Sequence, residues 1–181
     1  MMRALGMPFR DSRRGWWGLR RRPGRLALVV LRMPVTIYRN HPDRLPADTF
    51  LRLVHIGRRT GRPHEAVLML MRYDHEASEA VVCAAWGPDS DWVRNLRAGP
   101  AVIAQVGTRT FTPEHRFLTP RESYEIAVAF RREHPARLRL FSALLGWGNL
   151  WDDAALQSFV TTHPLIALRP APTKRADNPI G

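Results

Sequence analysis

Short apolar runs alternate with turn residues between Phe50 and Leu118, and this pattern predicts a series of β-strands. The runs are separated by segments rich in Gly, Pro, Asp or Ser, which favour turns. Gly107-Thr108, between the last two runs, has the length of a two-residue hairpin connection. The five predicted strands are residues 50–56, 64–73, 80–86, 101–106 and 109–118.

Helical spacing of apolar residues replaces this alternation after Pro120. Thr119 and Glu122 have the spacing of a capping box, which predicts that a helix begins here, and Pro135 ends it. The other predicted elements are helices at residues 26–38, 90–98, 137–145 and 152–160 and a closing strand at residues 165–168.

These elements predict an α+β fold: a meandering antiparallel sheet that forms a small β-barrel, open or split to admit a ligand, with flanking helices. With 181 residues, 45% of them hydrophobic, the chain is long enough for one well-buried domain. We expect a basic arm at residues 1–25, a barrel domain at residues 26–169 and a disordered tail at residues 170–181.

The net charge of +12 is concentrated in the arm, where eight Arg and one Asp give +7 and leave +5 for the rest of the chain. Lys174 is the only lysine, so the basic character is an arginine bias. The body lacks a helix-turn-helix, an aromatic RNA-binding pair and zinc-finger spacing. Nucleic acid is therefore not the partner that we expect.

The arm has two interpretations. Trp16, Trp17 and Leu19 lie among Arg and can sit at an anionic headgroup layer, which would bring the protein to the inner membrane surface; the alternative is a disordered basic tail. Cys83 is the only cysteine, which excludes an internal disulfide, and it lies in an apolar run. We expect Cys83 to fill a space in the core and the protein to be cytoplasmic.

A basic turn, Gly57-Arg58-Arg59-Thr60-Gly61-Arg62-Pro63, joins the first two predicted strands. Its backbone N–H groups and guanidinium groups can converge on one anionic group, and its two glycines allow a tight turn. The spacing matches neither a Walker loop nor a dinucleotide fingerprint. This cradle turn (residues 57–63) predicts a phosphate site, and an ordinary basic hairpin turn is the alternative that its residues leave open.

The third predicted strand leads into a second candidate segment, Ala84-Ala85-Trp86-Gly87-Pro88, followed by Asp89-Ser90-Asp91-Trp92-Val93-Arg94-Asn95. Two Trp, a Gly that permits close backbone approach, and Asp91 and Asn95 four residues apart can form the floor for a planar ring. The alternative is that Trp86 and Trp92 belong to the core and that Asp91 caps its helix.

The order of these motifs, with G-R-R-T-G-R-P first, then W-G, then S-D-W-x-x-N-L-x-A-x-P and a V-x-V-G turn, resembles the deazaflavin-dependent nitroreductase family of actinobacterial oxidoreductases. The likeness runs from about Leu26 to Arg169. It implies a split β-barrel like those of flavin reductases and pyridoxamine-phosphate oxidases, a homodimer, and coenzyme F420, an 8-hydroxy-5-deazaflavin with a phosphate and a polyglutamate tail.

The resemblance also implies roles for residues at matching positions. Phosphate and tail carboxylates would be held by Arg58, Arg59, Thr60 and Arg62, with Gly57 and Gly61 allowing close approach. The deazaflavin ring would be lined by Ala85, Trp86, Gly87, Trp92 and Asn95. The reduced cofactor would then pass a hydride to a small organic acceptor such as a quinone, an enone or a nitro-type compound.

The sequence leaves the catalytic residue, the acceptor pocket and the choice between three functions open. Val93 stands where the family commonly has Tyr, and Tyr124 and His134 are candidate proton donors that no spacing distinguishes, so the catalytic residue is unassigned. Trp147 and Trp151 are available to shape an acceptor pocket. A carrier that binds deazaflavin or a tetrapyrrole without turnover, and an enzyme that uses flavin mononucleotide (FMN) on the same barrel, are the alternatives. We expect no metal site, because HExxH and clustered Cys/His motifs are absent.

Overall fold

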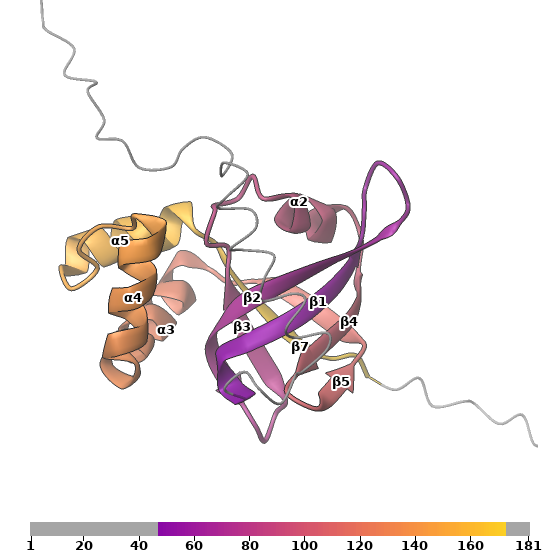
Figure 1. Cartoon of the computed structure of the whole chain (residues 1–181), viewed down its shortest axis with the longest axis horizontal. Helices are drawn as coiled ribbons and strands as arrows, with labels where there is room; N and C mark the ends of the chain where they lie inside the picture. Colours follow the sequence, from indigo (N-terminus) through magenta and orange to yellow (C-terminus); the bar gives the residue numbers. More distant parts are fainter. Residues whose placement is uncertain (1–46, 173–181) are drawn as a thin grey trace, which may run out of the picture.

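An antiparallel sheet that closes almost completely on itself forms the body of the protein in the computed structural model, which describes residues 47–172 (Figure 1). The strand order is β5-β4-β1-β2-β3-β7-β6. Thr112 alone separates β5 from β6, the two end strands, so the two edges of the sheet meet. The strands are β1 (Phe50–Ile56), β2 (Pro63–Asp74), β3 (Glu79–Cys83), β4 (Ala101–Val106), β5 (Arg109–Phe111), β6 (Pro113–Phe117) and β7 (Leu165–Pro170).

The helices occupy two places around this barrel. Helix α2 (Asp91–Ala98) lies over one end, as Figure 1 shows, while the other three gather on one side of the barrel. These three are α3 (Pro120–Glu133), α4 (Pro135–Leu145) and α5 (Asp153–Thr162), and a short 3-10 turn, η2 (Ala47–Thr49), precedes β1. The predicted α+β barrel with flanking helices is confirmed.

Both faces of the sheet are buried where the three helices cover it, because successive residues of a strand point to opposite faces. In β3, Ala80 and Val82 face the barrel interior, while Val81 and Cys83 belong to a second core shared with α3, α4 and α5. This explains why residues 80–83 form an uninterrupted apolar run rather than an alternating one. Cys83 fills a place in the core, as predicted.

The three helices form a lobe that is inserted into a β-hairpin. Strands β6 and β7 pair directly, with Phe117 opposite Ile166, and the Leu118 N–H donates to the Leu165 carbonyl at 2.9 Å. The predicted capping box begins α3: the Thr119 side chain accepts from the Glu122 N–H, and the Glu122 carboxylate accepts from the Thr119 N–H. These bonds and Arg116 lower the pKa of Glu122 to about 2.

The predicted strands at residues 50–56 and 101–106 are confirmed to the residue, and two others need correction. The third strand ends at Cys83 and not at Trp86, because the chain turns there: the Gly87 N–H donates to the Ala84 carbonyl at 2.7 Å. The predicted strand at 109–118 is two strands, β5 and β6, since the chain changes sheet partner at Thr112, before a proline that has no N–H to donate.

The strand order also departs from a simple meander. Strand β4 pairs with β1 instead of β3, and β7 lies between β3 and β6. Pro170, which the prediction placed in the tail, ends β7. The predicted basic arm, the helix at residues 26–38 and residues 173–181 of the predicted tail lie outside the described residues. Among residues 47–172, no helix has the length and hydrophobicity needed to cross a bilayer.

A thiol reagent should leave Cys83 unmodified in the native protein at about pH 8, because burial raises the pKa of this thiol to about 12 and blocks access to it. Ellman's reagent followed by absorbance would measure this, with the protein unfolded in guanidinium as the control that should titrate one thiol. Rapid reaction of the native protein would contradict the packing described here.

Candidate functional site

The cradle turn is closed by its own backbone hydrogen bonds. The Gly57 carbonyl accepts from the N–H groups of Thr60 and Gly61 at 3.1 and 2.8 Å, and the Gly57 N–H donates to the Arg62 carbonyl at 2.8 Å. Gly61 has φ +64°, a left-handed conformation that favours glycine. The expectation that backbone N–H groups converge on an anion is therefore wrong for these positions, because those groups close the turn. The N–H groups of Gly57, Thr60 and Gly61 are already used within the turn.

Gly57 is required by the packing of the turn against β2. A Cβ at this position would lie 2.7 Å from His64 Nε2 and 2.7 Å from Thr60 Oγ1, far inside van der Waals contact. His64 pairs with His55 across the β1–β2 ladder, and the two imidazole rings stack with their centroids 5.9 Å apart. The bare backbone of Gly57 thus lets the histidine pair lie beneath the turn.

The three arginines of the cradle turn have different surroundings. The Arg58 side chain is only 22% exposed, and its Nη1 donates to Asn95 Oδ1 at 2.9 Å and pairs with Asp91 Oδ1 at 3.1 Å. Arg59 and Arg62 are exposed, and within residues 47–172 neither guanidinium has an ion-pair or hydrogen-bond partner. The turn therefore offers two unpaired cations beside one that is tied to α2.

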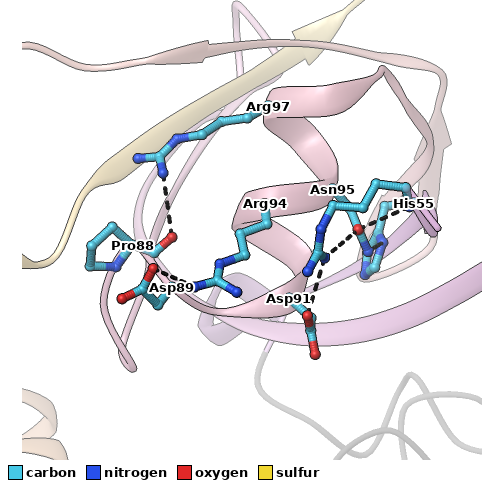
Figure 2. Close-up of polar contacts among 8 residues, drawn as sticks. His55, Pro88, Asp89, Asp91, Arg94, Asn95 and Arg97 are labelled. Atoms are coloured by element: carbon cyan, nitrogen blue, oxygen red, sulfur yellow. Dashed lines mark hydrogen bonds and ion pairs between the residues drawn. The ribbon is translucent and has the colours of Figure 1, made fainter.

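Helix α2 fixes the position of the turn relative to the barrel. Trp92, Val93 and Leu96 of α2 are buried in the barrel interior, and Asn95 is only 5% exposed. Figure 2 shows Asn95 reaching from this helix toward His55 of β1, while the Asp91 carboxylate points away from His55 and pairs with Arg58. Two arginines of α2 hold the loop that precedes the helix. Arg94 donates to the Asp89 carboxylate at 2.7 Å, and Arg97 donates to the Pro88 carbonyl at 3.5 Å.

The side-chain amide of Asn95 connects the turn to the core. Its Oδ1 accepts from the Arg58 backbone N–H at 3.1 Å as well as from Nη1, and its Nδ2 lies 3.0 Å from His55 Nδ1. Burial lowers the pKa of His55, and His64 lowers it further, while Asp91 acts in the opposite direction. His55 is thus a hydrogen-bonded residue of β1.

The second candidate segment, here called the ring segment (residues 85–87), is a turn between β3 and α2. Trp86 is 36% exposed, and Gly87 has φ +78°, with space for a Cβ limited by the Thr162 carbonyl at 3.4 Å. Trp92 is 9% exposed and belongs to the barrel core. The alternative interpretation, in which both tryptophans belong to the core, is thus right for Trp92 and wrong for Trp86. Asp91 does not cap α2, because Ser90 holds the N-cap position.

A contact from the helical lobe reaches the ring segment. Trp147 Nε1 donates to the Ala85 carbonyl at 3.3 Å, and the Trp147 ring packs against Phe159, which in turn stacks on His163 with centroids 4.3 Å apart. The sequence singled out Trp147 only as one of two available tryptophans, since nothing in its spacing indicates a partner sixty-two residues away.

The two proton-donor candidates lie in the lobe. Tyr124 is on α3, and His134 follows its C-terminus, where it packs on Phe130 with centroids 5.2 Å apart. Within residues 47–172, neither side chain forms a hydrogen bond with the cradle turn or the ring segment. Among the described residues no group of His, Cys, Asp and Glu could hold a metal ion.

The fold is a split β-barrel, and both the cationic cradle turn and the turn that carries the exposed Trp86 adjoin α2. The model of the F420H2-dependent quinone reductase family matches residues 31–137, more than half of the chain, and the protein belongs to this family. It is therefore an oxidoreductase that uses coenzyme F420. No curated protein matches the chain in sequence.

Three solved structures are similar to the chain at low identity. An F420-H2 dependent reductase, FDR-A, has 15% identity and a TM-score of 0.45, with 67% of this chain and 94% of that chain covered. A protein described as a domain-swapped dimer has 13% identity and a TM-score of 0.48 over 81% and 100% of the two chains. A pyridoxamine 5′-phosphate oxidase-related, FMN-binding protein of Nostoc punctiforme has 16% identity and a TM-score of 0.41 over 77% and 79%.

Replacing Gly57 by Ala should destabilise the protein by about 1–3 kcal/mol, because the new methyl group overpacks the turn against His64 and Thr60. A second substitution, His64→Ala, should recover part of this loss by vacating the space. Urea unfolding of the four proteins of this double-mutant cycle would measure both effects. Equal losses from Gly57→Ala in the presence and absence of His64 would show that the imidazole is not what excludes the side chain.

Proposed function

We propose that the cradle turn binds the phosphate and carboxylate tail of coenzyme F420, chiefly through Arg59 and Arg62. The observation that carries this assignment is the pair of exposed guanidinium groups that have no protein partner within residues 47–172. Arg58, by contrast, already binds Asn95 and Asp91. Thr60 adds a hydroxyl at the same turn.

The donor set fits the chemistry of this tail. A phosphate and several carboxylates need several cations close together, and the planar guanidinium group can donate two parallel hydrogen bonds to such oxygens. The N–H groups of Gly57, Thr60 and Gly61 would not serve, because they close the turn. The tail would therefore be recognised by charge and by side-chain donors.

We propose that the ring of the cofactor lies at the ring segment, against Ala85, Trp86 and Gly87. Trp86 offers an exposed aromatic surface, and Gly87 has no side chain to obstruct a close approach. Trp92 and Asn95, which the family resemblance places beside the ring, are buried, so they would support these two segments from behind. Three residues separate the ring segment from α2, the helix that also holds Arg58.

The reaction places simple demands on the protein. The reduced deazaflavin, when bound, supplies a hydride to the acceptor, for which the family description points to a quinone. The chain would hold tail and ring at fixed positions and leave one face of the ring accessible. Trp147, bonded to the Ala85 carbonyl, would place the helical lobe beside that face and so help to select the acceptor.

Two further features, the oligomeric state and the role of residues 1–25, are also proposals. A homodimer, and contact of residues 1–25 with the inner membrane surface, stay predictions. An arm-free variant assayed for vesicle binding would test the second of these without altering the described domain.

The double variant Arg59→Ala/Arg62→Ala should weaken binding of F420 by at least about a hundredfold, since each charge-assisted contact contributes about 1.5–3 kcal/mol. Fluorescence titration of the purified protein would measure the dissociation constant. The matched control is Arg121→Ala/Arg132→Ala, which removes two exposed charges from α3, where they pair with Glu125 and Glu133. An affinity equal to that of the control would overturn the role of the cradle turn.

Reduced F420 should be reoxidised by a quinone in the presence of the enzyme, and enone and nitro acceptors offer a comparison of acceptor class. The absorbance change of the deazaflavin on mixing measures turnover. A tight complex that does not respond to any acceptor would favour a carrier. Binding of FMN in preference to F420 would favour the flavin alternative.

A further inference from the structure

We propose that His55 and Asn95 are positioning residues that hold Arg58 and the cradle turn against α2, and that they do so only while His55 is neutral and carries its proton on Nε2. This inference rests on the proposed function of the cradle turn for its effect on cofactor binding. Its structural basis is the hydrogen-bond chain from Arg58 through Asn95 to His55.

The orientation of the Asn95 amide follows from its contacts with Arg58. The backbone N–H and the Nη1 group of Arg58 are donors only, and they lie 3.1 and 2.9 Å from the same amide atom. That atom must therefore be the acceptor Oδ1. The amide nitrogen of Asn95 is left to face β1.

The tautomer of His55 follows from this orientation. Asn95 Nδ2 is a donor only and lies 3.0 Å from His55 Nδ1, so Nδ1 must be an acceptor without a proton. A neutral imidazole that accepts at Nδ1 carries its proton on Nε2. The contacts of an arginine in the turn thus determine the protonation state of a histidine in the barrel.

The groups around His55 favour the same state. His55 is 4% exposed, its ring stacks on that of His64 from β2, and the Arg58 guanidinium lies on the far side of the Asn95 amide. Asp91 of α2 is the acidic group that faces this cluster, and its side chain is 85% exposed and paired with Arg58. A positive charge on His55 would be buried next to other basic groups and poorly compensated.

Protonation of His55 would break the chain. Two donors, Nδ1–H and Nδ2–H, would then face each other at a distance of 3.0 Å. Rotating the amide would relieve that contact, but it would turn Nδ2 toward the two donors of Arg58. Only one of the two partners of Asn95 can be satisfied, so the anchor between the cradle turn and α2 is lost.

The sign of the pH effect on stability follows. The pKa of His55 is lowered in the native protein from the usual 6.5, so the unfolded chain binds the proton first as the pH falls. The contribution of neutral His55 is complete above about pH 6.5 and is lost as the pH falls through the lower native pKa. Cofactor affinity depends on the native protein alone, so it should decline only as the pH falls toward the lowered native pKa.

The substitution Asn95→Asp tests the chain directly. The carboxylate has only acceptors, so it can keep the bonds to Arg58 but requires a proton on His55 Nδ1. We expect the pKa of His55 to rise and its proton to appear on Nδ1, as observed by nitrogen and carbon NMR of the histidine side chains, with the His55→Gln variant to assign the signal. Asn149→Asp, an exposed Asn in the helical lobe, is the matched control and should leave the His55 signal unchanged.

Cofactor titrations from about pH 8 to about pH 5 test the consequence for binding. F420 affinity of the wild-type protein should fall by roughly two- to tenfold as His55 protonates, the equivalent of one hydrogen bond. His55→Gln keeps an acceptor that cannot titrate, so it should retain the affinity at about pH 8 and lose this part of the pH dependence. His55→Leu should lose affinity at every pH, whereas a purely structural role would be satisfied by any side chain that packs.

The two hypotheses can fail separately. The NMR measurement needs no cofactor: a proton on Nδ1 of His55 in the wild-type protein, or the same pKa in wild type and Asn95→Asp, overturns the inference. Equal pH dependence of affinity in wild type and His55→Gln also overturns it. If the NMR results are as expected while Arg59→Ala/Arg62→Ala binds F420 normally, the proposed function of the cradle turn is overturned and the chain from Arg58 to His55 is supported.

Discussion

The burial of one face of α2 in the end of the barrel is the interaction on which the rest of the site depends. Trp92, Val93 and Leu96 fill the interior at this end, and the same helix carries Asn95 and Asp91 on the side that meets the cradle turn. The ring segment enters this helix directly. Because one packed helix positions both segments, the proposed binding regions for the ring and the anionic tail would have a fixed spacing.

Positive charge in the cradle turn is divided between one arginine that is held by α2 and two that are exposed. Arg58 is next to Arg59 in the sequence, yet the first is held by Asn95 and the second is exposed without a partner among the described residues. A tethered arginine contributes a fixed field and loses little further freedom, while exposed arginines can adapt to a flexible tail. The turn has three arginines in its sequence, but only two of them have no partner among the described residues and are therefore available to a ligand.

Local sequence patterns predicted most helices and strands of this fold, but they did not predict the contacts between residues far apart in the sequence. The alternation in residues 50–56 and the Thr119 and Glu122 spacing are visible in the sequence because each depends on neighbours a few residues apart. The end of β3 at Cys83 is not, since Ala84 and Ala85 continue the apolar run through the turn. The bond between Asn95 and His55 joins residues forty positions apart, and only the fold brings them together.

The position of the helical lobe within the β6–β7 hairpin has a consequence for how this family can diversify. The hairpin itself registers Phe117 against Ile166, so the lobe can change in length without shifting a strand if it still covers the outer faces of β3 and β7. The cradle turn and the ring segment both precede this insertion in the chain. Cofactor binding and acceptor selection would then be inherited as separable modules, the first constrained by the barrel and the second open to rapid evolutionary change.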